Sequence, residues 1–372
     1  MIYNYTIVGA GKMGEAIAYH LLQSKDTKEV LLRDVNLGQA QQTAKKLADE
    51  RVIPLGAPPG VRDLESSHVV FGAASYNLNL ALTKKAMSAR TNFVDLGGNN
   101  TVVEEQFKLD QKAKDEKVIV IPDCGIAPGA VSLITALGIE ELGELPDYVR
   151  IRVGGLPQSP RGLLNYMKVF SVEGLINEYN EPTEILQKGK RTLVESLTGL
   201  EELYFDIPGL GHSTRLEAAY TSGGSSTLTN TFAGKIKELD YKTIRFPGHF
   251  EKMHLLKRMG FFDGDTRKPT EEQITQLIDY PGRDMLLVRV SLGNRNKLLQ
   301  YELVDFDDGV HSAMQRTTGF SAAIIGQMIA RKQIIEPGVL IQENSIPPKL
   351  FFNEWAKCGL ELKVLEYPTK TK

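Results

Sequence analysis

Short apolar runs alternate with amphipathic segments along the first 125 residues. Between the runs, apolar side chains recur at helical spacing, as Ile17, Leu21 and Leu22 do, and segment 37–48 has the same character. The runs do not alternate between apolar and polar residues, which is typical of strands buried on both faces. Strands that alternate with helices predict right-handed crossovers and a parallel sheet. The predicted strands are 5–8, 30–32, 52–53, 69–71, 93–94 and 118–121.

After Pro122 the pattern changes to longer segments with a period of two. Segments 148–153, 286–291 and 299–304 alternate, and residues 293–296 form a good hairpin connection between the last two. Residues 130–142 and 312–332 return to helical spacing. This region therefore predicts a second domain of α+β type with a mixed, largely antiparallel sheet.

The whole chain predicts an α/β protein of two domains, since 372 residues exceed one ordinary core. We expect a dinucleotide-binding Rossmann domain at 1–125 that is completed by 310–372. The intervening segment, 126–309, is expected to form a substrate-binding and dimerisation domain. The tail after Pro337 predicts a short helix at 351–357 and a strand at 362–365.

Composition narrows the class of protein. The apolar and charged fractions, 42% and 24%, are those of a globular protein, and a net charge of −2 without a basic cluster argues against nucleic-acid binding. Two distant cysteines, Cys124 and Cys358, favour a reducing compartment. No signal peptide and no membrane-spanning run are evident, so we expect a cytoplasmic protein. The six histidines have no metal-ligand spacing, and no metal is predicted.

Gly9, Gly11 and Gly14 have the G-x-G-x-x-G spacing between a predicted strand and a predicted helix, with Lys12 and Met13 inside the loop. In such a loop the first glycine permits a tight turn and the second lets the backbone approach a pyrophosphate. The third allows close packing of helix on strand, and the helix N-terminus attracts the phosphates. A glycine turn that binds nothing has the same spacing, but strand, helix and glycines agree here.

Asp34 ends the second predicted strand, 20 residues after Gly14. A carboxylate at that place hydrogen-bonds the adenosine ribose and repels a 2′-phosphate, so NAD is favoured over NADP. Arg33 precedes it and is expected to soften this preference. Further cofactor contacts are expected where other parallel strands end, although each of these positions is also consistent with a simple tight turn. They are Ala73, Ala74, Asp95, Gly97 and Ile126.

Six further motifs resemble those of a known family. They occur in the family's order and the resemblance covers about residues 5–330. They are FVDLGG (93–98), IPDCGIAPG (121–129), VGGLP (153–157), VFSVEGL (169–175), TSGGSSTL (221–228) and YKTIRFPGH (241–249). The sequence resembles the lysine 6-dehydrogenases within the saccharopine dehydrogenase (glutamate-forming) family.

The resemblance implies a Rossmann domain, a second α+β domain that binds substrate and pairs subunits into a homodimer, and NAD(H) in the cleft. It also implies oxidation at a carbon that carries nitrogen, with a small amino acid as substrate. Two departures matter. Saccharopine reductases tend to carry a cysteine where this chain has Val153, which favours the lysine dehydrogenase branch. The tail after Pro337 is longer than in bacterial lysine dehydrogenases.

Oxidation of L-lysine at its ε-carbon requires an anchor for the α-carboxylate and an acceptor for the ε-ammonium proton. Arg245 is the candidate anchor, because a guanidinium binds a carboxylate with two parallel hydrogen bonds. Candidate catalytic residues are Asp123, Glu173 and His249, and each also has a structural interpretation as a turn, cap or core residue. Tyr241, Ser222 and Gly223 are candidates for the wall of the substrate pocket, with Tyr166 as a further pocket or core residue.

Three functions remain open at this point. The first is an NAD-dependent L-lysine 6-dehydrogenase. The second is a saccharopine or other secondary-amine dehydrogenase, which needs extra cationic anchors such as Arg152 or Arg215 for its additional carboxylates. The third is a non-catalytic NAD-binding regulatory protein, against which the motifs outside the glycine loop argue.

Overall fold

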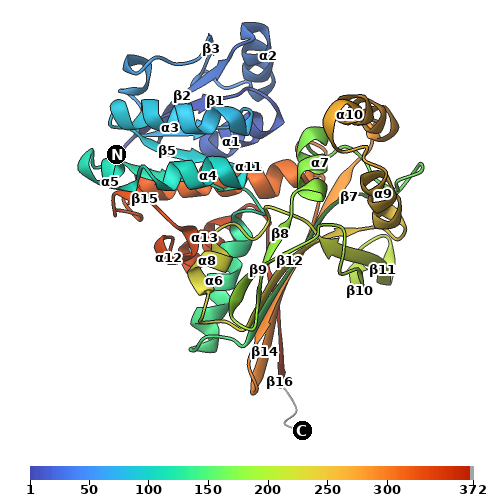
Figure 1. The fold of residues 1–372 in the computed structure, drawn as a ribbon. Coiled ribbons are helices and arrows are strands. Elements are labelled where there is room, and N and C mark those ends of the chain that lie inside the picture. Colours follow the sequence, from blue (N-terminus) through green and yellow to red (C-terminus); the bar gives the residue numbers. More distant parts are fainter. Residues whose placement is uncertain (369–372) are drawn as a thin grey trace. The chain divides into compact units, whose positions relative to one another are not determined.

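The computed structural model describes residues 1–368 and divides the chain into two compact units. The first unit comprises residues 1–133 and 315–359, and the second comprises 134–314 and the described residues from 360 on. Each unit contains its own sheet (Figure 1). The two are described separately below.

The first unit contains a parallel sheet with strand order β15-β6-β5-β4-β1-β2-β3. All six strands predicted for this region are present. The order reverses between β4 and β1, and in open parallel sheets ligands bind beyond the carboxyl ends of the strands at such a point. The strands are β1 (Tyr3–Val8), β2 (Thr27–Asp34), β3 (Val52–Gly56), β4 (Val69–Gly72), β5 (Asn92–Asp95), β6 (Ile119–Ile121) and β15 (Gly338–Val339).

Helices before and after the second unit's residues complete the first unit. The predicted tail helix is α13, whose fully buried Trp355 donates from Nε1 to Ser321 Oγ on α11 over 3.0 Å, so most of the tail is part of this core. The helices are α1 (Lys12–Leu22), α2 (Leu37–Leu47), α3 (Asn79–Ser88), α4 (Asn100–Phe107), α5 (Asp110–Asp115), α11 (Ala313–Ala330), α12 (Gln342–Ser345) and α13 (Pro348–Lys357), with 3-10 turns η1 (Arg62–Leu64) and η2 (Tyr76–Leu78).

The second unit contains a mixed sheet with strand order β10-β11-β12-β7-β13-β14-β16, to which β8 and β9 are attached. β12 and β7 pair in parallel and the other pairs are antiparallel, so the predicted fold class is confirmed. The strands are β7 (Tyr148–Pro157), β8 (Thr183–Gln187), β9 (Lys190–Val194), β10 (Glu201–Ile207), β11 (Gly211–Tyr220), β12 (Glu238–Arg245), β13 (Asp284–Gly293), β14 (Lys297–Phe306) and β16 (Lys363–Pro368).

Three helices of the second unit share one apolar core. Leu175 of α7, Phe250 of α9 and Ile274 of α10 belong to a single buried cluster, and α9 starts directly after β12. This packing fixes α7 against the end of β12, where Arg245 lies. The helices are α6 (Ala130–Leu142), α7 (Val172–Asn180), α8 (Leu228–Phe232), α9 (His249–Arg258) and α10 (Gly264–Ile278).

The end of the chain differs from the expected domain boundary. The strand predicted at 362–365 is present as β16, but it pairs with β14 in the second unit's sheet. Residues 360–368 therefore do not join the first unit with the rest of 310–372. A strand pattern alone does not identify its partner, because any sheet edge offers unpaired backbone groups.

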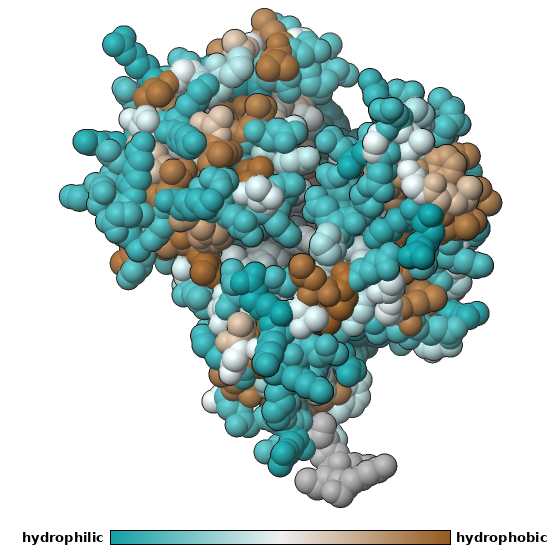
Figure 2. Space-filling view, viewed as in Figure 1, coloured by the Kyte–Doolittle hydropathy of each residue, from teal (hydrophilic) through white to brown (hydrophobic). Residues whose placement is uncertain are grey.

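Hydrophilic side chains cover most of the face shown in Figure 2, and the hydrophobic ones form small scattered groups. Scattered apolar residues are normal on protein surfaces and identify no binding site. Within residues 1–368, every helix is too short or too polar to cross a lipid bilayer.

Candidate functional site

The glycine loop between β1 and α1 is built from close backbone contacts. Gly9 has φ +111°, and a Cβ there would lie 2.6 Å from the backbone of Ala73, at the end of β4. A Cβ on Gly14 would overlap the carbonyl oxygen of Gly9. The loop and the residues after β4, Ala73 and Ala74, therefore pack as closely as a dinucleotide site requires.

Gly11 and the start of α1 fit a phosphate group. A Cβ built on Gly11 meets nothing within 4 Å, so the space in front of it is open. The N-terminus of α1 has no side-chain cap, and Glu15 of its first turn pairs instead with Lys46 at 2.6 Å. The backbone N–H groups of this first turn, which includes Lys12 and Met13, can therefore bind an anion.

Asp34 lies beside this loop at the end of β2. Its Oδ2 accepts from the backbone N–H of Ala10 and its Oδ1 from that of Asn36, both over 2.9 Å. Each carboxylate oxygen keeps a further lone pair, so Asp34 can also accept a ribose hydroxyl. Arg33 Nη2 lies 3.6 Å from Asp63 of the η1 turn, an ion pair longer than a hydrogen bond, and within residues 1–368 the buried Nε of Arg33 has no hydrogen-bond partner.

We expect Asp34→Asn to reduce the preference for NADH over NADPH by about tenfold, an order of magnitude typical of one charged contact. Asparagine keeps an acceptor for the backbone but removes the charge that repels a 2′-phosphate. Titration of both reduced nucleotides by protein fluorescence gives the two dissociation constants. An unchanged ratio would remove Asp34 from nucleotide discrimination.

Asp95 is the last residue of β5, and its side chain forms hydrogen bonds within the protein. It is fully buried, and its carboxylate accepts from Gln106 Nε2 at 2.6 Å and from the backbone N–H of Gly97 at 2.8 Å. Burial raises the pKa of this carboxyl group. The carboxylate of Asp95 thus shapes the turn, and the cofactor contact expected at this residue stays a prediction.

Asp123 follows β6 at the same edge of the sheet. Its φ is +64°, and a Cβ on Gly97 would overlap its Oδ1, so its side chain lies against the Gly97 turn. Its carbonyl oxygen accepts from Gln342 Nε2 at 2.6 Å, and Ile126 close by is buried. Backbone strain in a sequence-predicted site residue is typical of functional positions.

Arg245 ends β12 in the second unit and is 2% exposed. Its Nε donates to Tyr179 OH over 3.0 Å, its Nη1 donates to the carbonyl of Ile244 over 2.9 Å, and its guanidinium lies 4.6 Å from the centre of the Tyr166 ring. A guanidinium has five N–H donors. Within residues 1–368, Nη2 makes no hydrogen bond, so donors remain for a ligand.

His249, the first residue of α9, completes a chain of hydrogen bonds with Arg245. Its Nδ1 lies 2.9 Å from the carbonyl of Leu164, which can only accept, so Nδ1 carries the proton and Nε2 accepts from Tyr179 OH at 2.9 Å. Burial and the charge of Arg245 lower the pKa of His249 to about 3. The ring is therefore neutral and holds Tyr179 in place, and the role of a base stays a prediction for it.

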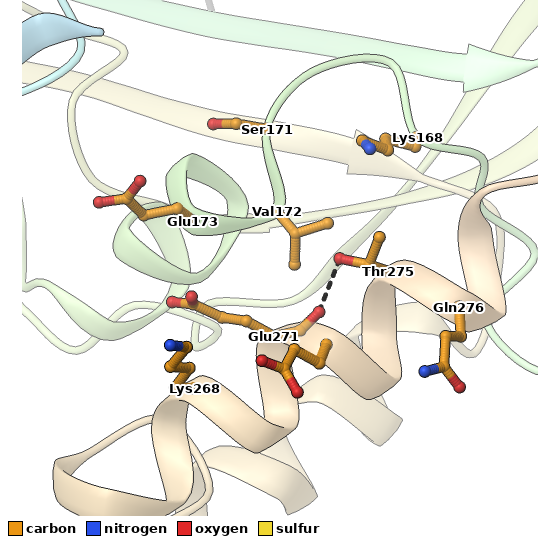
Figure 3. A pocket seen from close by; sticks show the side chains of 9 residues that line it. Lys168, Ser171, Val172, Glu173, Lys268, Glu271, Thr275 and Gln276 are labelled. Carbon is orange, nitrogen blue, oxygen red and sulfur yellow. Dashed lines mark hydrogen bonds between the residues drawn. The ribbon is translucent and has the colours of Figure 1, made fainter.

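Glu173 lies elsewhere in the second unit. It is exposed in the first turn of α7, which begins after Ser171, whose Oγ accepts from Gly174 N at 3.1 Å. The capping residue is thus Ser171 and not Phe170. Glu173 lines an open pocket of about 550 Å³ with residues of α10 such as Lys268 and Glu271 (Figure 3). It does not belong to the group that contacts Arg245.

Glu178, five residues further along α7, is the acid that the sequence did not indicate. Burial raises its pKa to about 7, and the charge of Arg245 opposes the rise. Its carbonyl accepts from Ser222 N over 2.9 Å, which joins α7 to the predicted Ser222–Gly223 turn. In the sequence, only its position next to Tyr179 could have indicated that Glu178 belongs to the site.

The predicted pocket-wall residues lie around the same group. Tyr241 is 5% exposed on β12, and a Cβ on Gly224 would overlap its ring, so the turn packs directly on the tyrosine. Gly223 has φ +87° and faces open space, while Ser222 Oγ lies 3.4 Å from the carbonyl of Asn177. The structure thus brings Tyr241, Ser222 and Gly223 together with Arg245 and Glu178.

We expect Glu178→Gln to stabilise the free protein above pH 7 by about 1–3 kcal/mol. The folded pKa near 7 exceeds the usual value of 4.5, so the native state binds more protons between these values and the carboxylate reduces stability as pH rises through them. Urea unfolding at pH 5, 6, 7 and 8 measures this, with the exposed Glu272→Gln as control. A gain that is the same at pH 5 and pH 8 would contradict a raised pKa.

Two other arginines of the second unit already have carboxylate partners. Arg152 is buried and bonded to Glu201 and Asp240, and the exposed Arg215 is bonded to Glu202. Arg152 uses its Nε, Nη1 and Nη2 in these contacts and with the carbonyl of Ile151, whereas Arg215 uses Nη2 alone. Within residues 1–368, no group of three or more His, Cys, Asp or Glu side chains is arranged to hold a metal ion.

Comparison with known proteins gives two family matches. Residues 5–121 match the saccharopine dehydrogenase NADP binding domain, and residues 125–360 match the saccharopine dehydrogenase C-terminal domain. The two matches together span nearly all of the chain. The first is a pyridine-nucleotide-binding domain, which agrees with the open, uncapped glycine loop.

Solved structures resemble this chain to different degrees, and the yeast enzyme shares its fold. Saccharopine dehydrogenase (L-Glu forming) from Saccharomyces cerevisiae superposes with a TM-score of 0.78 at 18% identity, covering 98% of this chain and 100% of that chain. A probable dehydrogenase from Thermotoga maritima reaches a TM-score of 0.45 at 12% identity, with 98% of both chains covered. UDP-N-acetylglucosamine 3-dehydrogenase from Acidithiobacillus ferrooxidans reaches 0.44 at 10% identity, with 96% of both chains covered. At these identities the likeness concerns the fold alone.

Proposed function

Because this chain belongs to the saccharopine dehydrogenase family of oxidoreductases, we propose that it oxidises the ε-amino carbon of L-lysine with NAD. The products are ammonia and the 6-semialdehyde, which closes to a cyclic imine. The homodimer implied by the resemblance and the cytoplasmic location expected from the sequence stay predictions.

The state of the arginines carries this proposal. Arg245 keeps donors for one carboxylate. Of the two extra anchors named for saccharopine, the buried Arg152 uses all three guanidinium nitrogens within the protein, and the exposed Arg215 is bonded to Glu202 through Nη2 alone. A substrate with a single carboxylate therefore fits the second unit best. L-Lysine has one carboxylate and an amine at the far end of a flexible chain.

The reaction needs the ε-amine in its neutral form, although its pKa in water is about 10.4. Bound oxidised nicotinamide supplies the hydride acceptor. Asp123, two residues after β6, stays the predicted acceptor of the ε-ammonium proton. Arg245 holds the carboxylate, and the neutral His249 keeps Tyr179 and Arg245 in place. Loss of a hydride from the ε-carbon and of a proton from its nitrogen leaves an imine. Water then adds to the imine carbon and ammonia leaves.

NAD is the proposed form of the dinucleotide. Asp34 keeps an acceptor for the ribose hydroxyl, and its negative charge opposes a 2′-phosphate. Arg33, the cation nearest to Asp34 in the sequence, forms an ion pair with Asp63 at 3.6 Å. The matching family is described as NADP binding, so both nucleotides belong in the assay.

Saccharopine dehydrogenase is the second candidate, favoured by the family and by the fold likeness to the yeast enzyme. A panel of L-lysine, saccharopine, L-ornithine and L-glutamate with NAD or NADP, followed at 340 nm, separates the two. We expect NADH formation with lysine at a kcat/KM at least 100 times that with saccharopine. The reverse preference would refute the proposal, and no turnover with any amine would favour the non-catalytic NAD-binding alternative.

A further inference from the structure

We propose that Glu178 and Arg245 form an amino-acid clamp, in which Arg245 binds the α-carboxylate and Glu178 binds the α-ammonium group of the substrate. The clamp deepens the proposed function and rests on it for the identity of lysine. It assigns a ligand class, a free α-amino acid in its zwitterionic form, to the second unit alone.

The two charged side chains are neighbours without being bonded, because Tyr179, which directly follows Glu178, accepts from Arg245 Nε over 3.0 Å. Glu178 and Arg245 influence each other's pKa, yet they form no direct ion pair within residues 1–368. In the same described range the Glu178 carboxylate makes no hydrogen bond, and neither does Arg245 Nη2. The Arg245 cation and the Glu178 anion therefore each lack a close partner of opposite charge. A zwitterionic amino acid supplies a carboxylate for Arg245 and an ammonium group for Glu178.

The open ends of both groups border accessible space. Within residues 1–368 the Glu178 oxygens, Arg245 Nη2 and the Tyr166 hydroxyl make no hydrogen bond, and they are not among the unbonded polar atoms that are sealed from solvent. These atoms are therefore reachable, although Arg245 and Tyr166 are each only 2% exposed. Reachable polar atoms on nearly buried side chains are typical of a small-ligand pocket.

The surroundings hold the two charges rigidly. α7 is fixed by the bond from Ser222 N to the Glu178 carbonyl, and Arg245 is fixed by Tyr179, which His249 holds in turn. The titratable neighbours of Glu178 are Arg245 and three tyrosines whose pKa values are raised by burial, so at neutral pH only Arg245 is charged. They are Tyr166, Tyr179 and Tyr241.

Ionisation of Glu178 gives the clamp a second readout. Burial raises the pKa of Glu178 to about 7, so in the free protein the carboxylate is fully formed only above that pH. An ammonium ligand binds the ionised form, so affinity for lysine is expected to rise about tenfold from pH 6 to pH 8. Glu178→Gln is expected to remove this dependence.

The test is calorimetric binding to the NADH complex, in which lysine cannot turn over. The ligands are L-lysine, 6-aminohexanoate, which lacks the α-amine, and cadaverine, which lacks the carboxylate. We expect wild type to bind lysine at least 30 times more tightly than 6-aminohexanoate. Glu178→Gln should remove that difference and change 6-aminohexanoate binding by less than threefold, while Arg245→Gln weakens both ligands. The exposed Glu272→Gln is the control.

The outcomes separate the clamp from the proposed function. If Glu178→Gln keeps the wild-type ratio, or lowers kcat with 6-aminohexanoate as much as with lysine, Glu178 is no α-ammonium ligand and the clamp is refuted. If lysine does not bind but another α-amino acid binds in a Glu178-dependent way, the clamp stands and the lysine assignment fails. If every α-amino acid fails to bind, the clamp fails whatever the turnover assay shows.

Discussion

Arg245→Gln is expected to raise the KM for L-lysine by about 100- to 1,000-fold, equivalent to roughly 2.7–4 kcal/mol. The guanidinium is proposed to give the substrate carboxylate two charge-assisted hydrogen bonds in a nearly buried place, where a lost partner is costly. The kcat is expected to change less, because the carboxylate is remote from the reacting carbon. Steady-state kinetics with saturating NAD measures both constants.

Matched substitutions separate anchoring from stability. Arg245→Lys keeps the charge without the planar fork and is expected to recover part of the loss. Arg215→Gln removes an exposed arginine of the same unit and should leave the kinetics unchanged. Thermal unfolding of each variant checks that the fold survives. A folded Arg245→Gln enzyme with an unchanged KM would exclude Arg245 from the substrate site.

Gly11→Val is expected to weaken NADH binding by at least about 100-fold while leaving the fold intact, a loss of roughly 2.7 kcal/mol. Gly11 has φ −75° and ψ −169°, which other residues adopt without strain, and its Cβ would contact nothing in the protein. The added side chain would instead fill the space where the pyrophosphate is expected to approach. Fluorescence titration with NADH gives the change in affinity.

Gly14→Ala is the informative contrast within the same loop. Its Cβ would overlap the Gly9 carbonyl, so the first unit must shift and its melting temperature should fall together with nucleotide affinity. The two variants thus distinguish a glycine kept for the ligand from one kept for packing. Tight NADH binding by a stable Gly11→Val protein would contradict the proposed position of the phosphates.

The first unit's strands were predictable because they are buried on both faces. Runs such as Val69–Gly72 are apolar throughout, and turns and helices separate them regularly. The second unit was harder to predict. β9 is largely exposed and shows no strong apolar pattern. β10 alternates between buried and exposed residues from Leu203 to Ile207, but this run is short and was not predicted as a strand. β16 was predictable as a strand but not in its pairing, because its partner β14 is about 60 residues earlier in the chain.

The dinucleotide loop was predictable from the spacing of its three glycines, because the turn that they form lies within one short segment of the chain. The substrate group depends on tertiary contacts instead. Glu178 approaches Arg245 only because α7 packs against the end of β12, and no spacing in the sequence shows this. His249 follows Arg245 closely in the sequence, but its bonds to Leu164 and Tyr179 join separate segments, and its burial beside Arg245, which lowers its pKa, has no local signal.

Deamination at the ε-carbon is tested most directly by the fate of labelled nitrogen. Purified protein is incubated with NAD and L-lysine that carries ¹⁵N at either the α or the ε position, and the released ammonium is analysed by mass spectrometry together with NADH formation. We predict that ε-labelled lysine releases one ¹⁵N-ammonium for each NADH formed and that α-labelled lysine releases none. Release of the α-nitrogen, or NADH formation without release of ammonium, would contradict the proposed reaction.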